Sequence, residues 1–180
     1  LASIGLAFHE LWLHIFGFGS AYDAFVFTRF FTSLIPSLIS VYLLYKLAQK
    51  LSDSKSFHYA VLFLSAFAFR WVESAHYAVP DSLTALAAIW TILEWVKLQK
   101  KQSVWVIFRL ALAISLGLAS KINVGLLLWG LVSILFIIEL LRKKQNFKNF
   151  LILQGLFLGI TLLVHLPYLF YLELYIEEIR

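Results

Sequence analysis

The sequence predicts an all-α fold: a polytopic transmembrane helical bundle with about six to seven spans. Hydrophobic residues make up 62% of the 180 residues and the mean hydropathy is +0.86, which excludes a soluble domain with a polar surface. The apolar residues form long continuous runs, whereas membrane β-barrels show alternating polarity over stretches of about ten residues. Because a helix needs about 20 residues to cross the hydrocarbon layer, the chain is long enough for six or seven crossings.

The apolar runs and the residues that interrupt them predict six successive spans. These are expected at about residues 24–45, 57–75, 82–97, 104–120, 122–141 and 149–166. An apolar segment suited to the membrane interface precedes them at Ala2–Phe18. The third span is expected to begin at Pro80 and Asp81, which both suit the first turn of a helix. Lys121 divides the hydrophobic stretch Val104–Leu141 into the fourth and fifth spans.

The connections between these spans are short, which predicts antiparallel neighbours in one transmembrane domain over residues 1–180. Pro36 is expected to kink the first span, because its ring removes one helical hydrogen bond. Since the chain has no methionine and starts with Leu1 in an apolar stretch, we expect an N-terminal part to precede it. The absence of cysteine excludes disulfides and thiolate metal sites from this sequence.

The basic residues gather after the first, third and fifth spans. The three clusters are Lys46, Lys50 and Lys55; Lys97, Lys100 and Lys101; and Arg142, Lys143, Lys144 and Lys148. Alternating spans place all three clusters on one face, which the positive-inside rule makes cytoplasmic. The net charge of +5 therefore reports topology and does not indicate nucleic acid as a partner. The opposite, outer face receives the segment Glu73–Ser82, the turn Ser120–Asn123 and an acidic, aromatic tail.

The segment Glu73–Ser82 concentrates ionisable groups between two apolar runs, which makes it a candidate functional site. At the start of a helix Asp81 is expected to be ionised, and there it can hold a divalent cation, orient an acceptor hydroxyl or act as a general base. The alternative is that Asp81 only stabilises the helix start. His76 offers a metal ligand or a proton carrier, and Tyr77 an interfacial phenol, but a structural role explains each equally well.

Two basic residues near the outer face are candidate ligands for a lipid-linked substrate. Lys121 either extends to phospholipid headgroups or binds the phosphate of such a substrate. Arg29 is expected to pair with an acidic side chain or with a bound phosphate. His9, Glu10 and His14 are polar groups on the first apolar segment, but they lack a third certain ligand for a metal site.

Three stretches together resemble the GT-C-type membrane glycosyltransferases of family 39, which include protein O-mannosyltransferases and lipid A aminoarabinose transferases. They are Phe16–Gly19 (FGFG) leading to Thr28–Leu34 (TRFFTSL), Ser74–Asp81 (SAHYAVPD) and Gly117–Asn123 (GLASKIN), with a weaker fourth match at His165–Tyr168 (HLPY). The resemblance implies a GT-C-like fold and transfer of a sugar from a polyprenyl-phosphate donor to a protein or lipid acceptor at the outer face. It also implies a multi-pass location in a prokaryotic plasma (inner) membrane.

In this resemblance Asp81 matches the second acidic position of the family and Lys121 matches its basic turn. We expect Asp81 to be catalytic, and we expect substrate binding by His76, Tyr77, Lys121 and Arg29. The resemblance implies no certain cofactor, and a divalent metal ion with unknown ligands is left open. The main catalytic carboxylate of the family is expected upstream of Leu1, and further spans are expected after Arg180. The resemblance therefore implies that the chain is the central part of a larger membrane domain. Asn123 departs from the aromatic residue that is common in the family.

Two other functions remain open on the sequence. A non-enzymatic helical membrane subunit of a larger complex, serving as a scaffold or binding lipid or pigment, would use His14, His58 or His165 as axial ligands. A transporter is disfavoured, because the ionisable groups gather at the outer ends of spans and not near the bilayer midplane.

Overall fold

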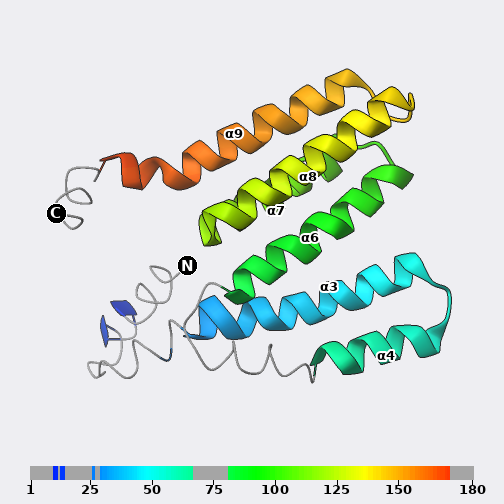
Figure 1. Cartoon of the computed structure of the whole chain (residues 1–180). Coiled ribbons are helices and arrows are strands. Elements are labelled where there is room, and N and C mark those ends of the chain that lie inside the picture. The colour runs from blue at the N-terminus through cyan, green and yellow to red at the C-terminus, as the bar shows by residue number, and fades with distance from the viewer. Residues whose placement is uncertain (1–9, 12, 15–25, 27–28, 67–80, 171–180) are drawn as a thin grey trace. The chain divides into compact units, whose positions relative to one another are not determined.

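The computed structural model describes residues 10, 11, 13, 14, 26, 29–66 and 81–170, with side chains up to residue 164. In this part of the chain all regular structure is helical (Figure 1). The elements are η1 (Phe30–Leu34), α3 (Ile35–Leu51), α4 (Lys55–Ala66), α6 (Asp81–Lys100), α7 (Val104–Ser120), α8 (Ile122–Leu141) and α9 (Phe147–Phe170). The prediction of an all-α fold is confirmed.

Three of the described helices are long and apolar enough to cross a membrane. They are Phe30–Leu51, Ile122–Leu141 and Phe147–Val164. The apolar helix α7 has 17 residues, and α6 has 20 residues but carries four charged side chains, which lower its hydropathy. The bounds predicted for the fourth and fifth spans agree with those of α7 and α8, because both helices end at charged residues.

The chain divides into two compact units, Leu1–Leu93 and Glu94–Arg180, with α6 continuing from the first into the second. In the first unit, α3 and α4 pack against each other. Ser54 accepts a hydrogen bond from the backbone N–H of Phe57 at the start of α4. Nε2 of His58 lies 2.6 Å from the carbonyl oxygen of Ser52, and the His58 ring meets Tyr45 edge to face. These contacts of His58 stabilise the connection between α3 and α4.

Pro36 is the second residue of α3 and follows the π-helical segment η1. The backbone N–H of Ile35 bonds to the carbonyl of Phe30, five residues earlier. This wider turn meets the α-helix where proline cannot donate a hydrogen bond. Pro36 thus lies close to a change from π- to α-helical hydrogen bonding, and its carbonyl oxygen accepts a bond of 2.7 Å from the Ser40 hydroxyl. The kink expected at Pro36 stays a prediction.

In the second unit, α7 packs against both α8 and α9. The largest fully buried apolar side chains of this unit are Leu98, Ile107, Leu110, Ile114, Phe136 and Leu153. Polar groups link the helices as well: Ser115 on α7 bonds to Thr161 on α9 at 3.3 Å. Gln154 on α9 accepts from the indole of Trp129 at 2.7 Å and donates to Ser133 at 3.1 Å. Such contacts hold membrane helices together where the hydrophobic effect cannot.

Candidate functional site

Asp81 is the first residue of α6, as the sequence predicts, and its side chain is half-buried. The next residue, Ser82, is buried and accepts a hydrogen bond of 3.2 Å from the Ser37 hydroxyl on α3. This bond fixes the beginning of α6 against α3 within the first unit. A carboxylate in the first turn of a helix interacts favourably with the positive end of the helix dipole, and Asp81 has this position in α6.

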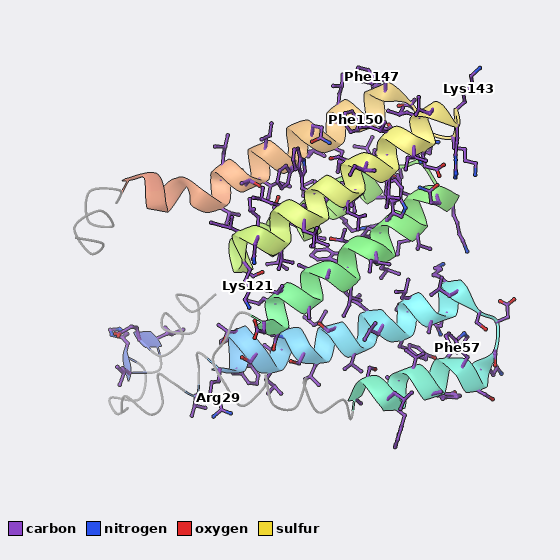
Figure 2. All side chains as sticks on the ribbon, viewed as in Figure 1. Arg29, Phe57, Lys121, Lys143, Phe147 and Phe150 are labelled. Atoms are coloured by element: carbon purple, nitrogen blue, oxygen red, sulfur yellow. The ribbon has the colours of Figure 1, made fainter. Side chains whose placement is uncertain are left out.

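Arg29 directly precedes η1, and its side chain is half-buried. It lies eight residues before Ser37, which corresponds to about 12 Å along a helix. Because Ser37 contacts Ser82, the end of the first unit at which α3 and α6 begin carries both Arg29 and Asp81. Figure 2 shows Arg29 at the opposite end of this unit from Phe57 on α4. Arg29 and Asp81 each interact with at least one other group of the protein.

Lys121 is the single residue between α7 and α8, and it is exposed with an extended backbone (φ −149°, ψ 116°). Its N–H bonds to the carbonyl of Gly117 at 2.9 Å, and its own carbonyl accepts from the N–H groups of Val124 and Gly125. Lys121 therefore ends one helix and begins the next. Figure 2 shows it at one end of α8, with Lys143 at the other.

A close approach of two backbones holds the turn at Lys121. A Cβ atom added to Gly125 would lie 2.2 Å from Cα and 2.5 Å from Cβ of Leu118 on α7. Real Cβ atoms essentially never approach other atoms so closely, so only glycine fits here. The position of Lys121 thus depends on a glycine four residues later.

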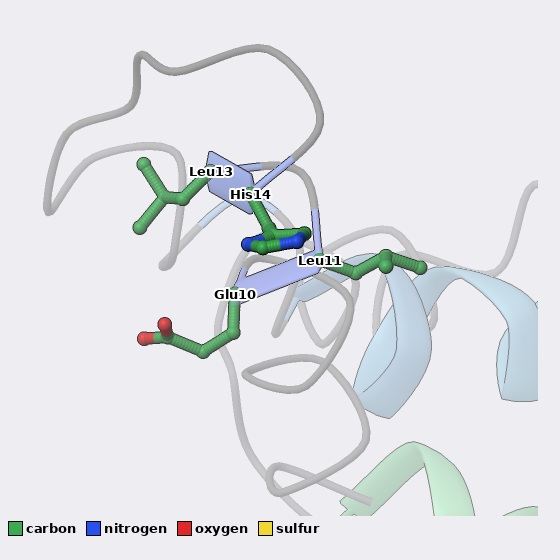
Figure 3. A pocket seen from close by; sticks show the side chains of 4 residues that line it. All are labelled: Glu10, Leu11, Leu13 and His14. Atoms are coloured by element: carbon green, nitrogen blue, oxygen red, sulfur yellow. The ribbon is translucent and has the colours of Figure 1, made fainter.

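Several of the predicted site residues lie outside the described residues, among them His76, Tyr77 and Glu73. Near the start of the chain, Glu10, Leu11, Leu13 and His14 line a shallow open depression (Figure 3). Across the described ranges, no group of three or more His, Asp or Glu side chains is placed to hold a metal ion.

One ionic cluster in the second unit was not predicted from the sequence. Glu94 on α6 is almost fully buried, and its two carboxylate oxygens bond to Lys97 at 2.6 Å and to Arg109 on α7 at 3.1 Å. The signal that could have revealed it is a glutamate inside the third apolar run and an arginine one turn inside the fourth. Charges that enter a span from both sides of one connection are expected to pair.

These features define a helical membrane protein in which an acidic and a basic residue mark the ends of helices. The sequence profile of the dolichyl-phosphate-mannose-protein mannosyltransferase (PMT) family matches residues 9–178. The chain belongs to this family of GT-C-type membrane glycosyltransferases. No protein of curated function and no solved structure is significantly similar to the chain.

Proposed function

We propose that this chain transfers a sugar from a polyprenyl-phosphate carrier to a protein or lipid acceptor at the outer, non-cytoplasmic face of the membrane. The observation that carries the proposal is the family match, which includes Arg29, Asp81 and Lys121. The name of the family describes a mannose donor on a polyprenyl phosphate and a protein acceptor. Two of these residues stand where helices begin or end, since Asp81 starts α6 and Lys121 separates α7 from α8.

The chemistry is a displacement at the anomeric carbon. The acceptor hydroxyl oxygen forms a new bond to that carbon and gives its proton to a base. The bond from the carbon to the phosphate oxygen breaks, and the phosphate leaves with the electron pair. Negative charge therefore grows on the leaving phosphate and must be stabilised in the transition state.

In the proposal each site residue has one role. Asp81 accepts a hydrogen bond from the acceptor hydroxyl and orients it, because an ionised carboxylate is an acceptor only. Lys121 binds the carrier phosphate as a point charge. Arg29 contributes a planar guanidinium fork to substrate binding. His76 and Tyr77 contact the substrate. A divalent cation at Asp81 would supply the same stabilisation of charge on the phosphate.

The membrane face follows from alternation of the helices. If α6 crosses from its start at Asp81 and α7 returns, the turn at Lys121 opens on the side where α6 begins. The connections 101–103 and 142–146, with the basic residues at and beside them, then face the cytoplasm, as the positive-inside rule requires. The resemblance to lipid A aminoarabinose transferases supports a location in a prokaryotic plasma membrane. In the proposal the chain forms a single domain that crosses this membrane several times.

Asp81→Asn tests this function with a nearly unchanged side-chain volume. We expect the rate of mannosyl transfer from a polyprenyl-phosphate donor to a serine-containing peptide to fall at least about 100-fold in proteoliposomes. Asp53→Asn is the matched control, since Asp53 is exposed in the connection between α3 and α4. Both variants are made in the full-length protein. Normal transfer by the Asp81 variant would remove this residue from the mechanism, and no transfer by the unaltered full-length protein would reject the function.

A further inference from the structure

The cluster around Glu94 carries one more positive than negative charge. The Glu94 side chain is only 2% exposed, and Lys97 and Arg109 each bond to one of its oxygens. A buried carboxylate is tolerated when both oxygens have charged partners. One cation would neutralise the Glu94 carboxylate. Because there are two cations, Glu94, Lys97 and Arg109 together have a net charge of +1.

Arg109 keeps most of its hydrogen-bonding capacity. It bonds to Glu94 through Nε, while the Arg109 side chain is 43% exposed. A guanidinium has five N–H donors, so four of them remain on the two Nη atoms. Within the residues that the structure describes, no hydrogen bond from these Nη atoms is found. Glu94 thus holds a partly exposed, pre-oriented fork of donors.

The place of the cluster on α6 and α7 suits the depth of a membrane interface. Arg109 is five residues after Val104, the start of α7, or about 7.5 Å along the helix axis. Glu94 is six residues before the end of α6, or about 9 Å. Trp105 lies one turn before Arg109 on the same face of α7 and is 71% exposed. Exposed tryptophan is typical of the level at which headgroups meet hydrocarbon.

From this placement we propose that Arg109 and Lys97 bind the phosphate of an anionic phospholipid headgroup, with Glu94 as the positioning residue. A guanidinium fork suits bidentate binding of phosphate oxygens. The lysines at the nearby end of α6, Lys100 and Lys101, strengthen the attraction of an anionic headgroup. Lys121 directly follows α7 and is twelve residues after Arg109, or about 18 Å along the helix axis. The proposed lipid site is therefore separate from the proposed donor site at Lys121.

The first test compares two Arg→Lys variants that keep the charge. Binding of phosphatidylglycerol to the purified full chain is measured by native mass spectrometry, with phosphatidylcholine as the reference lipid. Arg109→Lys loses the fork, and we expect about tenfold weaker binding. Arg142→Lys is the matched control, because Arg142 also lies near a glutamate (3.6 Å from Glu139) and its side chain is 63% exposed. The affinity of this variant for phosphatidylglycerol should equal that of the unaltered chain. Equal affinities of the two variants would overturn the site.

Glu94→Gln distinguishes a lipid site whose cations are oriented by Glu94 from diffuse electrostatic attraction of the anionic lipid. The substitution adds one net positive charge, so diffuse electrostatics predicts tighter lipid binding. A site that depends on Glu94 for orientation predicts weaker binding, and tighter or unchanged binding contradicts it. If this variant does not fold, the Arg109 and Arg142 comparison still decides. We expect inorganic phosphate at millimolar concentration not to displace the lipid; displacement would show that the site takes free phosphate and would reject the lipid as its ligand.

Discussion

Gly125→Ala is the sharpest test of how the turn at Lys121 is held in place. The added Cβ would lie 2.2 Å from Cα of Leu118, whereas non-bonded carbon atoms lie about 3.5–4.0 Å apart. The two helices would therefore have to separate by about 1.3 Å or more at this point. Rotation of a side chain cannot relieve the clash, because the obstacle is the backbone of α7.

The expected loss of stability follows from two opposing terms. Forcing an extra carbon into a packed contact costs about 1–3 kcal/mol, and a backbone obstacle favours the upper end of that range. Replacing glycine by alanine inside a helix gains about 0.5–1 kcal/mol. The free energy of unfolding should therefore decrease by about 2 kcal/mol.

Two other glycines provide matched controls. A Cβ at Gly130 or Gly159 would meet nothing within 4 Å, so only the helix-propensity term applies. Gly130→Ala and Gly159→Ala should each be more stable by up to about 1 kcal/mol. Unfolding in mixed micelles, followed by far-UV circular dichroism as the denaturing detergent is increased, measures all three variants. If Gly125→Ala is as stable as the controls, the close packing of α7 and α8 is not as described.

Three further variants test other parts of the molecule. Lys121→Ala should raise the apparent KM for the polyprenyl-phosphate donor about fivefold or more, with Lys144→Ala as an exposed control at the opposite end of α8; equal KM values would point to a lysine that only reaches lipid headgroups. Lys143→Gly should stabilise the second unit by about 1 kcal/mol, because Lys143 has φ 57° in a Schellman-type helix end that favours glycine. An unchanged detergent concentration at the midpoint of unfolding would contradict this. Gln154→Leu removes hydrogen bonds to an indole and to Ser133 on α8 and should cost about 0.6–1.7 kcal/mol in the same unfolding assay; a neutral result would mean that these bonds form equally well with other partners.

The places of Asp81 and Lys121 relative to the helices could be predicted from the sequence, but the contacts around them could not, and their roles stay predictions. The helix start at Asp81 and the turn at Lys121 were both expected, because a charge between apolar runs shows where a helix must leave the hydrocarbon. The bond from Ser37 to Ser82 was not expected, since it joins residues 45 positions apart and serine is common in membrane helices. The substrate contacts of His76 and Tyr77 remain predictions.

The sequence by itself determined the class of protein and the bounds of α7 and α8. Hydropathy and charge act locally: an apolar run must be helical in lipid, and a lysine or arginine must reach water. Only the tertiary structure decided which residues meet across helices. The contact of Gly125 with Leu118 and the pairing of Glu94 with Arg109 depend on the rotation and spacing of packed helices, which neighbouring residues in the sequence do not specify.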